Sequence, residues 1–405
     1  MAQRVAVIRG GNPGLTCIKC CLDEGLEPVC FESSDDIRGL WRFKETTEPE
    51  RSSIYRSLVV NTSKEMMCFS DFPMPAHFPN FMHNSLLLQY FRLYAEHFDL
   101  LKYIHLKAFF FFRHDFSHSG QWEVVTESSD GCKETHVFDA VFVCSGHFTR
   151  PVTPLLAFPG VDTFPGKCLH SWDYKDPEAF CGKRVLFGNS GGDIAVEISR
   201  FAEKNGPEGE LTLFRRVFPL SLEHPTLAFI GFLNATGPIM PLAEMQARWV
   251  TRVFTGQIHL PPLAKMQRII KKEMEAKINR YSNPASAALE VDYVPYIETI
   301  AQEVGVRPNL LWLFLTDPGL SWRVLFGPTT PYQYRLRGPG RWEGGLPGNL
   351  YPVGAHYSAF KHTAHSRAQI LQPHPLAECG REHPADFHCH FTANEKPQLP
   401  SGSEQ

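Results

Sequence analysis

The sequence predicts an α/β fold in which short parallel strands alternate with helices, and two observations support this. Short runs rich in β-branched residues lead directly into glycine-rich turns and then into helical periodicity, near the amino terminus and again near residue 184. The chain has 405 residues, of which 43% are hydrophobic and 20% charged. That length predicts two or three folded domains with sizeable cores.

Composition excludes several classes of protein. The net charge is −3, so the chain offers no basic field for nucleic acid. No apolar run reaches the roughly 18 residues that a spanning helix needs, and the run Val5–Ile8 is too short for a signal peptide. A cytosolic setting is therefore expected, in which the 11 cysteines are reduced thiols, mostly buried. Cys17 and Cys20 form a C-x-x-C without a second ligand pair nearby, so no metal site is predicted there.

The first predicted unit begins with a buried strand over 4–8 and a glycine turn over 10–14. A helix over 15–24 follows, and then a second strand over 27–31 that ends at Glu32. Strand, turn, helix and strand in this order are typical of a parallel βαβ unit. Further along, apolar spacing predicts a helix over 84–98, capped by Asn84 or Ser85, and alternation predicts a hairpin over 121–144 that ends in the strand 139–144.

A second unit opens with a strand over 184–187, a turn over 188–192 and a helix over 193–204. The elements expected after it are strands over 211–214 and 226–230, an amphipathic helix over 242–254 and a charged, solvated helix over 265–281. From about residue 345 the character changes to a proline- and histidine-rich tail. A metal site around His383, His388, Cys389 and His390 is one hypothesis for that tail, and a disordered segment is the favoured one.

The first turn, Arg9-Gly10-Gly11-Asn12-Pro13-Gly14, approximates G-x-G-x-x-G, the fingerprint of a Rossmann-like dinucleotide site. In that fingerprint the second glycine lets the backbone approach a pyrophosphate and the third lets the helix pack on the strand. Arg9 stands in the place of the first glycine, where a left-handed or strained turn would disfavour arginine. Glu32 lies about 20 residues on, where an acid binds ribose hydroxyls. The alternative is a glycine turn in an unrelated α/β protein.

The second turn, Gly188-Asn189-Ser190-Gly191, keeps only the last half of the same fingerprint. Two imperfect fingerprints in one chain indicate two dinucleotide sites, for a flavin and a nicotinamide dinucleotide. Arg215 and Arg216 end the strand after the second turn and could select a 2′-phosphate, or could be a solvated basic strand end. Before this turn, Phe164, Gly166, His170 and Tyr174 match F-x-G-x-x-x-H-x-x-x-Y at every specified place.

Together these segments resemble the flavin-containing monooxygenases of the mammalian drug-metabolising, dimethylaniline type. Phe31–Trp41 is similar to a flavin-domain segment of that family, and Asn61–Pro75 is similar to its most recognisable stretch. The segments Leu315–Pro318 and Phe326–Trp342 are similar to a late segment of that family, so the resemblance covers about 3–345.

The chain also departs from the family pattern. Arg9 and Arg38 replace glycines, and the first glycine of the second fingerprint is missing. A block expected after about residue 205 is absent, so Arg215 would match the segment after that block instead of the 2′-phosphate strand. By the same comparison, the family's C-terminal membrane-anchoring helix is expected to be replaced here by the unmatched tail.

The resemblance implies a Rossmann-like FAD-binding domain and a second, truncated NADP-binding Rossmann-like domain. The expected division is 1–150 for the first part of the FAD domain and 151–216 for the truncated NADP domain. Residues 217–345 would return to the FAD domain and add a helical part, and 346–405 would be the divergent, disordered tail. The resemblance also implies that the protein lies at the cytosolic face of the endoplasmic reticulum and associates peripherally with the membrane. A cytoplasmic protein is the alternative.

The resemblance further implies the reaction, in which NADPH reduces FAD and dioxygen forms a C4a-hydroperoxyflavin. That species would oxygenate a soft nitrogen or sulfur atom of a small amine or sulfide, as in xenobiotic metabolism. Alternatives are a catalytically impaired member, from a degraded gene or a splice form, and an uncoupled NADPH oxidase that releases hydrogen peroxide.

The implied site residues fall into four groups, none of which includes a metal ligand. Asn61 is the candidate catalytic residue, hydrogen-bonding near the isoalloxazine, or else a turn amide that caps the next segment. His170 and Tyr174 would position domains. The FAD residues are Arg9, Gly10, Gly11, Asn12, Pro13, Gly14, Glu32, Leu40, Trp41, Val60, Asn61 and Thr62. The NADP residues are Ser190, Gly191, Gly192 and Asp193.

Overall fold

The computed structural model describes 3–37, 39–48, 51–112, 120–128, 131–146, 149, 151, 169–176, 213–220, 222, 224–278 and 290–341. The chain divides into two compact units, Met1–His356 and Tyr357–Gln405, and every described residue lies in the first. The second glycine turn, the helix expected over 193–204 and the histidine-rich tail lie outside the described residues.

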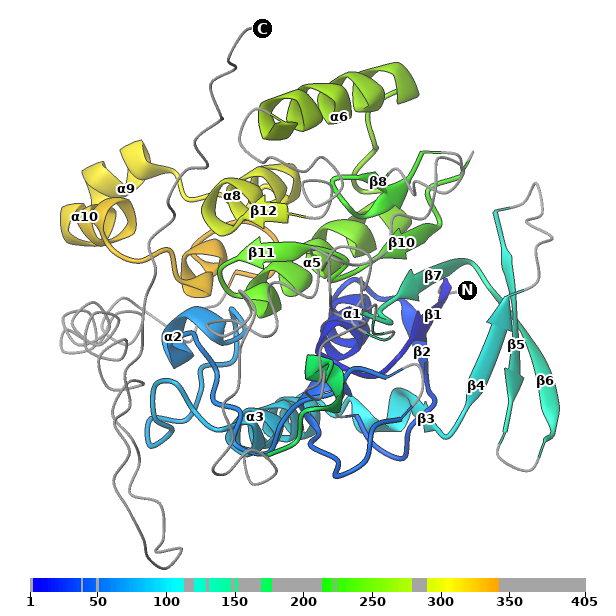
Figure 1. The fold of residues 1–405 in the computed structure, drawn as a ribbon. Coiled ribbons are helices and arrows are strands. Elements are labelled where there is room, and N and C mark those ends of the chain that lie inside the picture. The colour runs from blue at the N-terminus through cyan, green and yellow to red at the C-terminus, as the bar shows by residue number, and fades with distance from the viewer. Residues whose placement is uncertain are drawn as a thin grey trace, which may run out of the picture. The chain divides into compact units, whose positions relative to one another are not determined.

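A five-stranded parallel sheet forms the centre of the described fold (Figure 1). Its strands run in the order β10-β7-β1-β2-β3, so the first two strands of the chain are neighbours and β7 lies beside β1. Each of the four pairings is parallel, which confirms the predicted βαβ opening. The strands are β1 (Arg4–Ile8), β2 (Glu27–Glu32), β3 (Ile104–Leu106), β7 (Ala140–Val143) and β10 (Leu227–Phe229).

Helix α1 (Asn12–Asp23) connects β1 and β2, and it begins three residues earlier than predicted. Gly11 is its N-cap and Pro13 lies in its first turn, a place where the missing N–H of proline costs nothing. Leu15 and Cys17 are fully buried against the sheet. This packing fixes the amino-terminal end of α1 at the carboxyl end of β1.

A three-stranded antiparallel sheet, β4-β5-β6, confirms the predicted hairpin region. Its strands are β4 (Phe109–Phe112), β5 (Trp122–Glu127) and β6 (Lys133–Phe138). Alternation along β1 explains how the two sheets meet. Val5 and Val7 belong to the main core, whereas Ala6 and Ile8 belong to a smaller core with Val124 of β5. Both faces of β1 are therefore buried, as its continuous apolar run requires.

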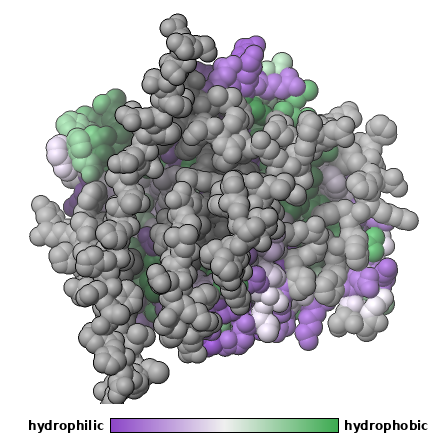
Figure 2. Space-filling view, in the orientation of Figure 1, coloured by the Kyte–Doolittle hydropathy of each residue, from purple (hydrophilic) through white to green (hydrophobic). Residues whose placement is uncertain are grey.

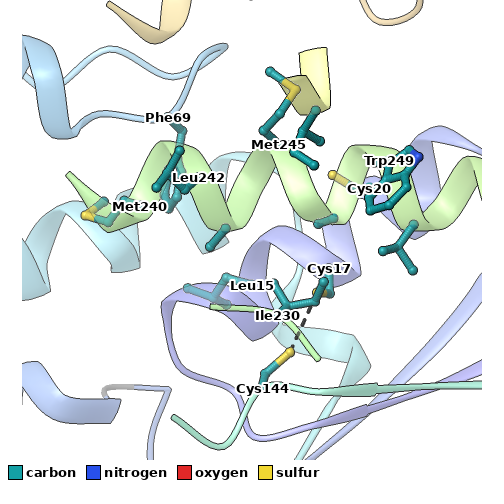
Figure 3. Close-up of a cluster of buried hydrophobic side chains, with 14 of the residues drawn as sticks. Leu15, Cys17, Cys20, Phe69, Cys144, Ile230, Met240, Leu242, Met245 and Trp249 are labelled. Atoms are coloured by element: carbon teal, nitrogen blue, oxygen red, sulfur yellow. Dashed lines mark hydrogen bonds between the residues drawn. The ribbon is translucent and has the colours of Figure 1, made fainter. Parts of the chain in front are cut away.

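Helix α5 (Ile239–Phe254) lies across α1 and is buried on nearly all sides. It begins three residues before the predicted boundary, after Pro238. Figure 3 shows Leu242, Met245 and Trp249 of α5 packed in the same cluster as Leu15 and Cys17 of α1. Helix α8 (Tyr293–Val304) packs on α5 and ends at Gly305 in the left-handed conformation.

Helix α3 (Asn84–His97) confirms the helix expected over 84–98, but its cap differs from the prediction. The N-cap is His83, whose Nδ1 accepts a hydrogen bond from the backbone N–H of Ser85 at 3.3 Å. Asn84 instead donates its side-chain amide to the carbonyls of Arg56 and Leu58. A histidine ring can serve as the acceptor at this position, which residue preferences alone did not indicate.

Two further predicted elements are present within the described residues. The strand expected over 211–214 is described only as β8 (Leu213–Phe214), which forms a short antiparallel pair with β9 (Phe218–Pro219). The charged helix is α6 (Leu263–Ile278), largely exposed as predicted. The remaining elements are η1 (Gly39–Trp41), α2 (Lys64–Met67), η2 (Leu101–Tyr103), η5 (Ser171–Asp173), β11 (Asn234–Thr236), β12 (Glu290–Asp292), α9 (Leu310–Thr316), α10 (Pro318–Phe326) and η9 (Pro331–Arg335).

The cysteines behave as the composition predicted. Six of the seven described cysteines are buried, and none of the seven is in a disulfide. The Sγ atoms of Cys17 and Cys144 lie 3.6 Å apart in the core beneath the sheet (Figure 3). Burial raises the pKa of Cys17 well above its usual range, so this thiol is unreactive. The C-x-x-C of Cys17 and Cys20 is part of the hydrophobic core.

Candidate dinucleotide-binding site

The first glycine turn lies where β1 passes into α1, at the carboxyl edge of the parallel sheet. Ligands of open α/β sheets bind at this edge. The N–H of Gly10 donates to Oε2 of Glu32 at 2.8 Å, which ties the turn to the end of β2. The fingerprint glycines and the acid predicted to bind ribose are thereby brought together by one hydrogen bond.

Gly14 allows the helix to pack closely on the turn. A β-carbon at this position would lie 2.0 Å from the carbonyl oxygen of Arg9, far inside any real contact. Only glycine fits here without movement of the backbone. This is the task that the fingerprint assigns to its third glycine.

Gly11, the N-cap of α1, has space beside its backbone where a side chain would begin. A β-carbon there would meet only the α-carbon of Gly39, at 3.6 Å. The first turn of α1 holds no acidic residue, so its free N–H groups and dipole favour an anion. Oδ1 of Asn12, in the same turn, is buried without a hydrogen-bond partner among the described residues. Close backbone approach, free donors and an unsatisfied polar atom together fit a dinucleotide pyrophosphate.

Glu32 is held rigidly at the end of β2 and is 3% exposed. The N–H of Ser34 donates to its Oε1 at 2.8 Å, and the guanidinium of Arg51 lies 3.8 Å from the same oxygen. Each carboxylate oxygen therefore has one backbone donor and keeps acceptor capacity for ribose hydroxyls.

Arg9 occupies a backbone conformation that suits glycine. Its φ is 81°, in the left-handed region, as the strained turn predicted from the sequence requires. Its guanidinium donates to Oγ of Ser33 at 2.6 Å, while its Nε is buried without a partner among the described residues. The Arg9 side chain thus extends toward Ser33, the residue that follows Glu32 at the end of β2.

Leu40 and Trp41 lie in η1, immediately after Gly39, whose backbone contacts Gly11. Both side chains are partly buried, and Trp41 packs against the main core. Arg38 lies outside the described residues. The structure thus brings the 39–41 segment next to the fingerprint turn.

Val60, Asn61 and Thr62 precede helix α2. Val60 is 4% exposed, and its N–H donates to the carbonyl of Met82 at 2.9 Å. Asn61 is exposed, and its Oδ1 accepts from the Thr62 hydroxyl at 3.2 Å. The N-cap of α2 is Ser63, which makes no side-chain capping hydrogen bond. The Asn61 amide faces outward from a firmly anchored segment.

A buried network of charges, which the sequence did not indicate, anchors the continuation of that segment. Glu244 of α5 accepts from the backbone N–H of Ser70 at 2.7 Å and from the Ser70 hydroxyl. The guanidinium of Arg335 donates to Glu244 at 2.9 Å and to Asp71 at 2.8 Å. Lys19 of α1 donates to the same oxygen of Asp71 at 2.7 Å.

The network controls protonation as well as position. Burial alone would raise the pKa of Asp71, but the adjacent Arg335 and Lys19 outweigh it and lower that pKa below its usual range. Glu244 is 2% exposed and Arg335 is 4% exposed, so each charge needs the other to offset the cost of its removal from water. The network joins α1, α5 and η9 to the loop that continues from Asn61.

His170 and Tyr174 flank η5, as its N-cap and C-cap residues. Nδ1 of His170 accepts from the N–H of Trp172 at 3.0 Å, and the ring of Tyr174 lies 5.5 Å from that of Tyr55. The indole N–H of Trp172 donates to the carbonyl of Arg51 at 2.7 Å. These contacts join 169–176 to 51–56. The partner residues Phe164 and Gly166, and the NADP candidates Ser190, Gly191, Gly192 and Asp193, lie outside the described residues.

Arg215 and Arg216 form the turn between β8 and β9 and do not end a Rossmann strand. Both have left-handed φ values, 55° and 57°, and both guanidinium groups pair with Glu273 of α6. A short hairpin closed by an ion pair gives no surface for a nucleotide 2′-phosphate. The 2′-phosphate interpretation is therefore wrong, and the solvated strand end is also wrong because Arg216 is 9% exposed.

The chain matches the model of the flavin-binding monooxygenase-like family over residues 2–207 and 205–350. Most of the chain is covered by these two matches. It belongs to the flavin-containing monooxygenase family.

Curated members of the family show the same relationship. The chain is 40% identical to rat (Rattus norvegicus) flavin-containing monooxygenase 5 over 481 aligned residues, which cover 84% of this chain and 90% of that protein. It is 38% identical to macaque (Macaca mulatta) dimethylaniline monooxygenase [N-oxide-forming] 2 over 484 residues, covering 85% and 90%.

Two solved structures share the fold. S-allyl-L-cysteine S-oxygenase from Allium sativum has a TM-score of 0.65 and 23% identity, over 89% of this chain and 99% of that one. Tmm from Pelagibacter sp. strain HTCC7211 has a TM-score of 0.56 and 19% identity, over 74% and 86%. The predicted α/β fold class, with Rossmann-like domains, is thereby confirmed.

Family membership confirms the enzyme class, a flavin-dependent monooxygenase, and the cofactor class, FAD with NADP(H). It also supports the predicted internal loss. The alignment with the rat protein spans 481 positions, more than the 405 residues of this chain. The two family matches meet at 205–207, where a missing block was expected.

Proposed function

We propose that this chain binds FAD at its first turn and uses NADPH and dioxygen to oxygenate soft nitrogen or sulfur atoms of small molecules. The observation that carries the proposal is the close packing of Gly14 against the Arg9 carbonyl oxygen, which would lie 2.0 Å from a β-carbon at position 14. Membership of the chain in this family gives that packing its meaning. That packing shapes the helix terminus for a pyrophosphate.

The residues proposed for FAD divide by the part of the cofactor they would contact. The turn and the first residues of α1 would hold the pyrophosphate, and Glu32 would accept from the ribose hydroxyls. Asn61 would hydrogen-bond near the flavin ring, which supplies the oxygen-activating chemistry when bound. The turn residues are Arg9, Gly10, Gly11, Asn12, Pro13 and Gly14, and those on the flavin side are Leu40, Trp41, Val60, Asn61 and Thr62.

The second cofactor site is proposed from the sequence. Ser190, Gly191, Gly192 and Asp193 would hold the NADP phosphates at a second helix terminus. Phe164, Gly166, His170 and Tyr174 would position that part of the chain. Contacts of Trp172 with Arg51 support such a role, because they join this motif to the segment that also approaches Glu32. The proposed division remains 1–150, 151–216, 217–345 and 346–405.

The substrate class rests on the relatives. One relative at 38% identity is named as forming the N-oxide of dimethylaniline, which is an oxidation of a soft amine nitrogen. Oxygen transfer of this kind depends on the orientation of the substrate and on the exclusion of water from the pocket more than on an acid–base pair. We therefore expect small amines and sulfides, as in xenobiotic metabolism, without a catalytic dyad.

One specific finding favours an alternative outcome. The internal loss near 205 removes residues from the part proposed to bind NADP, and Arg9 strains the FAD turn. Weak nicotinamide binding would leave the reduced flavin unshielded, and NADPH oxidation would then release hydrogen peroxide. A member that holds no cofactor is the other alternative.

A direct test is to measure NADPH consumption, peroxide and oxygenated product together, with the full chain reconstituted with FAD and given an aryl methyl sulfide. The account predicts sulfoxide formation that stops in an Asn61→Ala variant of unchanged stability. Peroxide equal to the NADPH consumed, with no sulfoxide, would support the oxidase instead.

We also propose peripheral attachment to a membrane, at the cytosolic face of the endoplasmic reticulum, through the α9–α10 hairpin. None of the described helices is long and apolar enough to cross a bilayer. Helices α9 and α10 nevertheless expose a continuous apolar surface, visible at the upper left of Figure 2. Leu311 and Leu315 are 73% and 74% exposed, and Trp312 is 59% exposed.

The charges around this surface fit an anionic lipid surface. Asp317, the one acidic residue of the hairpin, uses Oδ1 to cap α10 at the N–H of Leu320. Arg323 of α10 supplies a cation beside the exposed rings of Trp322 and Phe326. Exposed leucines and tryptophans with a basic neighbour are typical of interfacial helices.

A further inference from the structure

The guanidinium of Arg9 has more hydrogen-bond donors than the described part of the chain uses. A guanidinium carries five N–H donors, and Nη1 of Arg9 donates one of them to Oγ of Ser33 at 2.6 Å. Nε is buried and has no partner among the described residues. Within that part of the chain Arg9 also makes no ion pair. The fold therefore holds this cation at a left-handed position without giving it a counter-ion.

A second guanidinium approaches the same hydroxyl. Arg51 donates through Nη2 to Oγ of Ser33 at 3.3 Å, and the same nitrogen lies 3.8 Å from Oε1 of Glu32. Because Oγ of Ser33 accepts from both arginines, its own O–H is left as a donor, and it has no acceptor among the described residues. Arg9, Ser33 and Arg51 are each partly exposed, so a ligand can reach them.

The carboxylates of this region do not neutralise Arg9. Each described carboxylate of residues 32–48 has a cation of its own, and no cation serves twice in this pairing. Arg51 also lies 3.3 Å from Glu48, but Lys44 holds that carboxylate as well. The pairs are Glu32 with Arg51, Asp35 with Arg42, Asp36 with Arg92, Glu45 with Arg56 and Glu48 with Lys44. Arg9 is the cation left over.

The place of Arg9 and Ser33 in the fold indicates which anion would meet them. Glu32 is proposed above to accept from the hydroxyls of an adenosine ribose, and Ser33 is the next residue of the chain. In Rossmann-like sites an acid at the end of the second strand binds the ribose 2′-hydroxyl, whereas a nearby arginine accommodates a 2′-phosphate. This chain holds both kinds of residue. Guanidinium groups bind phosphate through charge-assisted, often paired hydrogen bonds.

Glu32 does not prevent a phosphate from lying beside it. Its Oε2 accepts from the N–H of Gly10 and its Oε1 from the N–H of Ser34, both at 2.8 Å, and Arg51 lies next to the carboxylate. These donors and the cation offset its negative charge. A ribose that carries a 2′-phosphate keeps its 3′-hydroxyl, which can still donate to Glu32.

We propose that the first site also accepts NADP(H), with the 2′-phosphate held by Arg9, Arg51 and the Ser33 hydroxyl. The inference rests on the proposed FAD site, at which NADP(H) is then a competitor of FAD. It is separate from the NADP site proposed at residues 190–193. The consequence is that the chain without flavin takes up FAD less readily when NADP(H) is abundant.

The test measures the dissociation constant of FAD for the full chain without flavin, from the quenching of flavin fluorescence. NADP+ or NAD+ is added in rising amounts at constant ionic strength. NADP+ should raise the apparent constant linearly, as a competitor does, with an inhibition constant about tenfold below that of NAD+. A charge-assisted hydrogen bond to the phosphate is usually worth that factor. In Arg9→Gly the preference for NADP+ over NAD+ should disappear.

This preference separates phosphate binding from backbone strain, because relief of the strain at residue 9 changes the affinity for both nicotinamide dinucleotides alike. Arg56→Ala is the matched control. It removes an exposed arginine that pairs with Glu45 and not with Ser33, so it should leave the preference unchanged. Thermal unfolding checks that both variants fold.

Three outcomes would overturn the inference. They are equal inhibition by NADP+ and NAD+, an unchanged preference in Arg9→Gly, and an apparent constant that levels off as NADP+ rises, which indicates binding at another site only. If the chain takes up no FAD, the proposed function fails separately. The inference is then tested by titration calorimetry with NADP+, and equal affinities of the unmodified chain and Arg9→Gly would overturn it.

Discussion

The carbonyl oxygen of Arg9 occupies the space that a side chain on Gly14 would need, since a β-carbon there would lie 2.0 Å away. We predict that Gly14→Ala destabilises the chain by about 3 kcal/mol or more, because the conflict is with backbone and not with a flexible side chain. Urea unfolding followed by circular dichroism measures the loss.

Gly11→Ala is the matched control for that prediction. Its β-carbon would meet only Gly39, at 3.6 Å, so stability should change by less than about 0.5 kcal/mol. FAD affinity should nevertheless fall, because the backbone can no longer approach the pyrophosphate closely. Equal stability of the Gly14 and Gly11 variants would contradict the packing argument.

Arg9→Gly should stabilise the protein. The left-handed φ of 81° costs an arginine about 1 kcal/mol, which glycine avoids. Loss of the hydrogen bond to Ser33 offsets part of this, so we expect a net gain of about 0.5 kcal/mol in unfolding free energy. FAD retention after gel filtration should rise as well. A less stable variant with lower flavin content would show that the Arg9 side chain binds the cofactor.

Glu244→Gln should destabilise the protein by about 3 kcal/mol, since it leaves Arg335 with one carboxylate partner fewer in a buried site. Chemical denaturation measures the change. Glu303→Gln on α8 is the control, because Glu303 is exposed and its loss should lie within about 0.5 kcal/mol. Similar effects at both positions would mean that the network contributes little.

Stability should depend on pH through Asp71. Its pKa is lowered in the folded state, so its contribution is present above the unfolded pKa of about 3.9 and is lost as pH falls through the folded value. Unfolding free energy measured from about pH 5 down to pH 2 should therefore fall more steeply in the unmodified chain than in Asp71→Asn. Parallel curves would contradict the assignment.

The α9–α10 hairpin should bind lipid. Leu311→Glu with Leu315→Glu should abolish co-flotation with vesicles that contain phosphatidylserine, because both leucines would otherwise enter the acyl boundary. Leu263→Glu changes an exposed leucine of α6, 48% exposed, and should leave flotation intact. If the unmodified chain does not float, the membrane proposal fails.

Local patterns in the sequence predicted the parts of the fold that depend on neighbouring residues. The βαβ opening followed from β-branched runs beside glycine, and the left-handed turn at Arg9 followed from its place in the fingerprint. The segment 39–41 came close to the turn, as the resemblance implied.

Long-range relationships could not be predicted in this way. Glu244, Asp71 and Arg335 are far apart in the chain, and each looks like an ordinary charged residue until packing buries it. The antiparallel pairing of β8 with β9 was not predicted, because the apolar run 211–214 carries no information about its partner strand. The exposed face of α9 was missed because apolar periodicity predicts burial, whereas these side chains face outward.

The central claim is that FAD binds at the turn between β1 and α1 and is reduced by NADPH. The most direct test is the visible absorption spectrum of the purified chain, incubated with FAD and freed of excess, before and after anaerobic addition of NADPH. We predict a flavin spectrum that NADPH bleaches, with less retained flavin in Gly11→Ala. A colourless protein that takes up no FAD would contradict the claim.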